Sequence, residues 1–180
     1  MTHPIHIVTY KKRISFVLWV VAAALVAALA GCSSSGTLEE ISSSVTERQE
    51  LVATRGAEVM PFDLERTTHI FEKQEKGGLQ QVIADDPGDE EQIGLIRTHL
   101  AEEAERFQQG DFHDPAMIHG EDMAGLHELM LGAERITVTF SELPDGAQIV
   151  YTTDDPELVS AIHAWFDMQV ADHGDHAVRE

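Results

Sequence analysis

The chain of 180 residues is 43% hydrophobic, which is enough for one domain of ordinary size with a packed core. Its 12 basic and 32 acidic residues give a formal net charge of −20 at pH 7, which excludes nucleic acids and anionic lipid surfaces as favourable partners. Cations are better partners for such a chain. The single cysteine, Cys32, excludes an intrachain disulfide.

The first 31 residues have the pattern of a secretion signal. Three basic residues at 11–13 precede an apolar run over 14–30. The run ends in Leu29-Ala30-Gly31-Cys32, which resembles a bacterial lipobox and implies cleavage before Cys32 and attachment of lipid, such as palmitate, to its sulfur. An uncleaved anchor helix is the alternative, although the run is short for a membrane span. Loss of residues 1–31 would change the formal charge to −23.

A tether and a stalk helix are predicted over residues 32–62. Ser33 after the cysteine resembles the pattern of lipoproteins sorted to the outer membrane, facing the periplasm, in a Gram-negative cell. A serine-rich spacer follows, and Thr37 with Glu40 forms a capping-box pattern at the start of a helix expected over 38–54. Pro61 ends this region, and we place the start of the folded domain at Asp63.

Residues 63–110 read as two strands and a helix. Two short strands, over 65–71 and 79–84, flank a turn that ends in Gly77-Gly78 and predict a hairpin. The helix is expected over 89–108, with Gly110 after it. Its apolar side chains share one stripe: Ile93, Ile96, Leu100, Ala104 and Phe107.

Residues 111–133 form an insert that is rich in histidine and methionine. A helix over 121–131 would place Met123, His127 and Met130 on one face, close to His119. Imidazole nitrogen and thioether sulfur together favour copper. The alternative is a packed connector, in which the methionines fill the core and the histidines are solvated.

Residues 134–180 repeat the first unit at an offset of 69 positions. Eight residues are identical over a 23-residue segment, including a turn glycine and the Asp-Asp-Pro sequences at 85–87 and 154–156. Two hairpins of this size cannot each bury a face alone. We therefore predict an α+β fold, in which tandem ββα units form one four-stranded antiparallel sheet with both helices on one face and the insert between the units.

Two histidines outside the insert are further candidate metal ligands. His99 lies four residues before Glu103, and His163 lies four residues before Asp167. Such pairs hold a metal ion or form an ordinary ion pair. His69 is equally consistent with burial and ligation, and two histidines near the C-terminus could complete a site: His173 and His176.

The predicted function is binding of a transition-metal ion by an exported, lipid-anchored protein. The proposed ligands are His119, Met123 and His127, with His99 or His163 contributed by a facing helix; copper is favoured and zinc is the alternative. GxSxG, HExxH, Walker, GxGxxG and CxxCH motifs do not occur, so we predict no catalytic residues and favour a binding protein over an enzyme. The rival hypothesis is an interaction module of the cell envelope that docks another protein. A hydrolase or transferase is the third hypothesis, and it requires a pocket that holds a catalytic acid or base.

From residue 67 onward the chain resembles a small, uncharacterised family of bacterial proteins. The segments that carry the resemblance are TTHIFE, the Asp-Asp-Pro helix start, GDFHDPAMIHGEDM, LPDGA and HAWFDMQVADHG. Members often carry the label aspartate carbamoyltransferase, but the Ser-Thr-Arg-Thr loop that binds carbamoyl phosphate in that enzyme does not occur here. The resemblance implies no site residues. The lipobox implies an exported version of the domain.

Overall fold

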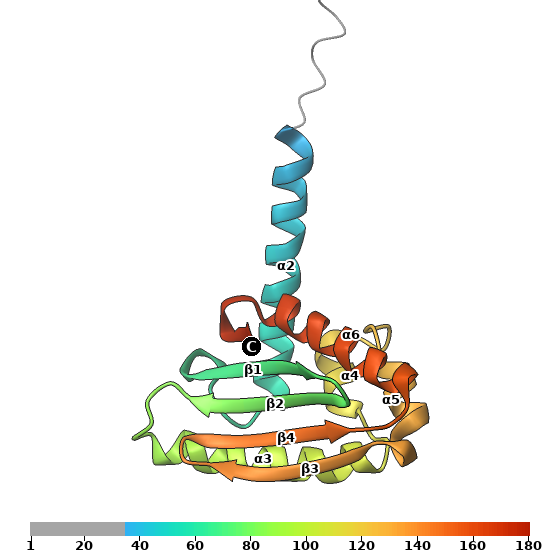
Figure 1. Ribbon diagram of the computed structural model, residues 1–180. Helices are drawn as coiled ribbons and strands as arrows, with labels where there is room; N and C mark the ends of the chain where they lie inside the picture. The colour runs from blue at the N-terminus through green and yellow to red at the C-terminus, as the bar shows by residue number, and fades with distance from the viewer. Residues whose placement is uncertain (1–34) are drawn as a thin grey trace, which may run out of the picture. The chain divides into compact units, whose positions relative to one another are not determined.

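The computed structural model describes residues 35–180, which have an α+β fold with one mixed five-stranded sheet (Figure 1). The predicted signal sequence, the predicted lipobox and Cys32 lie outside the described residues. Ser44–Glu180 forms one compact unit, and all the contacts below lie within it. Among residues 35–180, none of the helices combines the length and the apolar character that a membrane span requires.

The elements follow one another as helix, hairpin, three helices, hairpin, helix and a final short strand. Their bounds are α2 Ser35–Val59, β1 Thr67–Gln74, β2 Gly77–Ala84, α3 Glu90–Gln108, α4 His113–His119, α5 Leu126–Gly132, β3 Thr137–Leu143, β4 Gly146–Thr152, α6 Pro156–His173 and β5 Ala177–Arg179. Single 3-10 turns precede β1, β3 and β5. The strand-strand-helix order therefore occurs twice, as the repeat predicts.

The sheet has the strand order β3-β4-β2-β1-β5. Both hairpins close with the same two-residue turn, since the last pairs are Gln74↔Gly77 and Leu143↔Gly146. The prediction of four antiparallel strands is correct for these hairpins but incomplete for the sheet. The C-terminal residues return after α6, and β5 pairs in parallel with β1, with Ala177 opposite His69.

The two long helices lie on the same face of the sheet, and each packs mainly on the hairpin of the other repeat. Helix α3 packs mainly against β4 and β3, whereas α6 packs mainly against β2, β1 and β5 (Figure 1). Their shared face holds an aromatic core, in which the Trp165 ring contacts Phe107 of α3 and Tyr151 of β4 at centroid distances of 6.0 and 5.5 Å. The core therefore joins both halves of the chain.

Aspartate side chains begin both long helices. Asp89 accepts a hydrogen bond from the Gln92 amide at the start of α3, and Asp155 accepts one from the Glu157 amide at the start of α6. Such N-caps satisfy amides that have no partner within the helix. Pro156 occupies the first turn of α6, where its missing amide costs nothing.

The insert does not contain the single helix predicted over residues 121–131. It forms α4 and α5, separated by a turn in which Gly120 and Gly125 have φ angles of 100° and 82°. These left-handed conformations interrupt a helix. Gly125 also lies against α6, because a Cβ there would be 2.1 Å from the carbonyl oxygen of Ala161. A close approach to α6 thus fixes the start of α5 at Leu126.

Candidate functional site

Four buried or partly buried histidines line one cavity of about 30 Å³ in the core. They come from four elements that are distant in the sequence: His69 from β1, His99 from α3, His119 from the end of α4, and His173 from the end of α6. Phe62 packs on two of them, with centroid distances of 6.0 Å to His69 and 5.8 Å to His99. The fold therefore gathers imidazole rings that the sequence distributes over a hundred residues.

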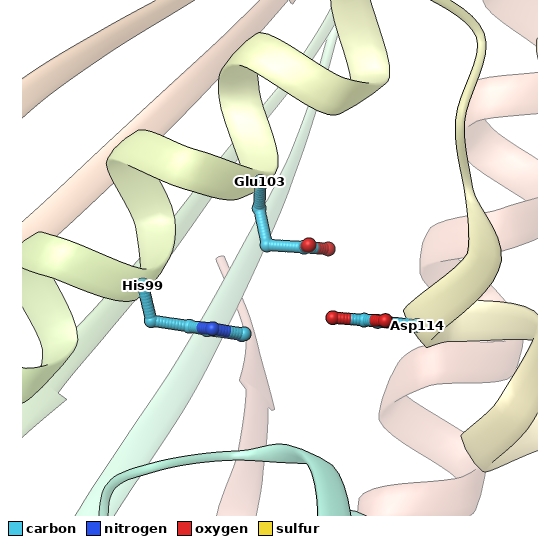
Figure 2. A group of neighbouring side chains, drawn as sticks. All are labelled: His99, Glu103 and Asp114. Carbon is cyan, nitrogen blue, oxygen red and sulfur yellow. The ribbon is translucent and has the colours of Figure 1, made fainter.

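On one side of the cavity, His99, Glu103 and Asp114 bring three metal-ligating groups together. One ligand atom from each lies within 4.8 Å of the others. His99 and Glu103 are one turn apart on α3, so their side chains point the same way. Figure 2 shows these two side chains directed toward the Asp114 carboxylate, which α4 presents from the opposite side.

Arg106 holds both carboxylates of this group. Its Nη1 donates to Oε1 of Glu103 at 2.9 Å and to Oδ2 of Asp114 at 2.7 Å, and its Nε donates to Asp111 at 2.9 Å. Burial, followed by the nearby Asp114 charge, raises the pKa of Glu103 to about 8. Without an ion, Glu103 is therefore mostly protonated at neutral pH.

On the other side of the cavity, His69, His173 and His119 form a row of stacked and edge-on rings. The His69 and His173 rings are nearly parallel, with centroids 4.8 Å apart, and His119 meets His173 edge-on at 5.1 Å. Burial lowers the pKa of His69 to about 4 and also lowers the pKa of His173. These two rings are therefore neutral at pH 7.

An ion-pair network of Asp172 and Arg48 holds His119 in place. Its Nδ1 lies 2.8 Å from Oδ2 of Asp172, and Arg48 of α2 binds Asp172 through Nε at 2.9 Å and Nη2 at 2.6 Å. Arg48 also donates to the carbonyl oxygen of His119 at 2.6 Å. Burial opposes ionisation of Asp172, but the hydrogen bonds from His119 and Arg48 outweigh it and lower the pKa to about 2.

The structure places only two of the five predicted metal ligands at this cavity. His99 and His119 line it. Met123 instead packs in the hydrophobic core, and His127 is exposed. His163 lies apart, with Nε2 at 3.0 and 2.9 Å from the carbonyl oxygens of Gln74 and Gly77.

The sequence does not predict Asp114, which lies on a separate helix. It also does not predict that His69 and His173 stack on each other. The spacing of His99 and Glu103 was a usable signal, because it places both on one helix face. Nothing in the local sequence of α4 or β1 indicates that Asp114 and His69 approach α3. Asp114 and His69 approach α3 only because the insert packs against the two repeats.

The cavity is therefore lined by His99 and Glu103, with the Asp114 carboxylate close to both, and by neutral imidazoles and aromatic rings. Such a donor set suits zinc, manganese or iron ions. No family model matches the chain, and no curated protein or solved structure is significantly similar to it.

Proposed function

We propose that the protein binds one divalent transition-metal ion through His99, Glu103 and Asp114. The observation that carries the proposal is the approach of these three groups to within 4.8 Å of one another. Two of the three side chains, His99 and Glu103, are buried. A buried carboxylate is uncommon unless it is paired or coordinates a metal.

Arg106 supports this arrangement while leaving part of each carboxylate available. Its contacts with Glu103 and Asp114 use one oxygen of each, Oε1 and Oδ2. The second oxygen of each carboxylate is then the proposed ligand atom. Hydrogen bonds that orient ligating carboxylates are usual around metal sites. If no metal binds, the same groups form a hydrogen-bond network around Arg106 that stabilises the junction of α3 and α4.

Zinc is the ion that the donor set favours. Three protein ligands of nitrogen and oxygen type leave a fourth position for water, as in zinc sites that act on substrates. The sequence pattern favours copper because it combines imidazoles with the thioether of Met123, but the Met123 side chain packs among apolar residues. Copper therefore becomes the competing ion in the same titration.

The test is a metal titration of protein purified without an affinity tag and stripped with a chelator. We expect submicromolar zinc binding with one ion per chain, and a loss of more than about 100-fold in Glu103→Gln. Glutamine resembles the protonated form of Glu103, so this variant should keep its fold. Its circular dichroism and unfolding midpoint provide the check.

The matched control is His127→Gln, which changes an exposed histidine of the insert. It should bind zinc like the unmodified chain. If His127→Gln abolishes binding and Glu103→Gln does not, the ion is held by the insert as the sequence pattern suggests. If neither zinc nor copper binds, the proposal is wrong and the group is a hydrogen-bond network around Arg106.

We also propose that the protein is exported and anchored by lipid on Cys32, with the domain in the cell envelope. The lipobox at residues 29–32 and the basic and apolar segments before it support this proposal. Metabolic labelling with palmitate should mark the chain. Cys32→Ala should abolish the label and leave the signal uncleaved, and a labelled variant would contradict the assignment.

A second candidate function is docking of an envelope protein. The observation that favours it is the face of the sheet that α3 and α6 do not cover. No helix of the described residues covers this face, which is turned toward the viewer in Figure 1. Partly exposed apolar side chains occur on it, including Ile70, Leu79, Ile83 and Val150. This function predicts a partner whose binding weakens in Ile83→Lys and is unchanged in Glu103→Gln.

A further inference from the structure

Two residues that line the cavity each have a buried polar atom without a hydrogen-bond partner. Within residues 35–180, the only buried side-chain nitrogen or oxygen atoms that have none are Nδ1 of His69 and Nε1 of Trp165. Both residues line the cavity together with His99 and Glu103. Unpaired buried polar groups are rare because they lose their bonds to water on folding. Two of them on one small cavity indicate a polar ligand between them.

The chemistry of the two atoms defines what that ligand must offer. The indole Nε1–H of Trp165 is only a donor, so the ligand must be an acceptor. Nδ1 of His69 donates or accepts according to the tautomer of the ring. Water and small anions satisfy both atoms, whereas a cation alone would leave the indole N–H unpaired.

The size of the cavity limits the ligand further. A volume of about 30 Å³ holds one or two molecules of the size of water. Its remaining wall is largely apolar and includes Phe62, Phe71 and Phe107, which are buried in the core. A metabolite with a ring or a branched chain does not fit without unfolding this wall.

Building on the metal site proposed above, we infer that the open coordination position of that ion faces His69 and Trp165. This position takes water or an inorganic anion of two or three atoms. The ion supplies the positive charge that an anion requires in a chain of strongly negative charge. His69 and Trp165 act as hydrogen-bonding residues for the exchangeable ligand and are not themselves ligands of the ion.

The test uses the full chain loaded with Co²⁺, whose visible absorption changes when a ligand in its coordination sphere is exchanged. Titration with azide should change the spectrum, and imidazole at the same concentrations should not. Trp165→Phe and His69→Leu should each weaken azide binding by about tenfold, the cost of one hydrogen bond. Both should retain Co²⁺ affinity within about threefold, since neither contacts the ion.

His176→Gln serves as the control, because His176 is partly exposed and pairs with Glu65 outside this cavity. It should leave both affinities unchanged. A chain that binds Co²⁺ but does not respond to azide would overturn this inference and leave the metal site intact. Azide binding that neither Trp165→Phe nor His69→Leu weakens would also overturn this inference. Binding of imidazole as tightly as azide would overturn it as well. A chain that binds no Co²⁺ would overturn the metal site and this inference together.

Discussion

Replacing Arg48 with methionine tests whether the network behind His119 stabilises the domain. The guanidinium binds both carboxylate oxygens of Asp172, whose side chain is only 4% exposed, while Arg48 itself is 36% exposed. Methionine keeps much of the length and apolar contact of the arginine stem but removes its charge. Asp172 would then keep His119 as its partner and lose the cation.

The pKa of Asp172 gives the magnitude. It lies at about 2, against an ordinary value of 3.8. Each pKa unit corresponds to about 1.4 kcal/mol, so the ionised network contributes about 2 kcal/mol to folding. His119 and Arg48 share this contribution and Arg48 is partly exposed, so we expect Arg48→Met to lose about 1–2 kcal/mol. That loss lowers the midpoint of thermal unfolding by about 3–6 °C.

The loss should depend on pH in a defined direction. A carboxylate with a lowered pKa stabilises the fold above its ordinary pKa near 3.8, and this contribution disappears as the pH falls through about 2. Urea unfolding followed by circular dichroism at several pH values measures it. The difference between the unmodified chain and Arg48→Met should be constant from pH 7 to about 5 and should shrink between about pH 4 and 2.

Arg179→Met is the matched control, because Arg179 also binds a carboxylate at 2.6 Å but the pair is exposed. The side chains of Arg179 and Asp167 are 52% and 46% exposed, and Lys73 remains as a second partner of Asp167. This change should cost well under about 1 kcal/mol. Equal losses in Arg48→Met and Arg179→Met, or a difference that does not shrink in acid, would refute the reasoning.

Three further predictions concern packing, backbone conformation and the metal. Gly94→Ala should raise the free energy of unfolding by about 0.5–1 kcal/mol, since Gly94 lies within α3 and a Cβ there meets nothing within 4 Å. Gly125→Ala should lower it by at least about 2 kcal/mol, because of the clash with Ala161 and the left-handed φ. Urea unfolding checks both. Zinc at 100 times its Kd should raise the free energy of unfolding by about 2.7 kcal/mol. A thermal shift should record this gain, which should vanish in Glu103→Gln.

Local signals in the sequence were sufficient to predict much of the fold. The predicted helix over 89–108 differs from α3 by one residue, because its apolar stripe and its Asp89 cap are local features. The Pro144-Asp145 turn was likewise visible from its residues alone. Strand β5 was missed because three residues carry no periodicity, and the strand exists through its pairing with β1.

The candidate site was less predictable because its parts meet only through tertiary packing. His99 and Glu103 are related by helix geometry and could be paired from the sequence. The grouping of Met123 with His127 depended on a continuous helix over 121–131. The left-handed Gly125 interrupts that helix, and its close approach to α6 leaves no mark in the local composition.

The exchange of α3 and α6 between the two hairpins makes the repeats mutually dependent. A mutation that frays α3 exposes strands β3 and β4, which lie far along the chain, while the hairpin preceding α3 keeps the cover of α6. Neither repeat can finish folding before the other has been synthesised. Each hairpin thus depends for its cover on a helix from the other half of the chain.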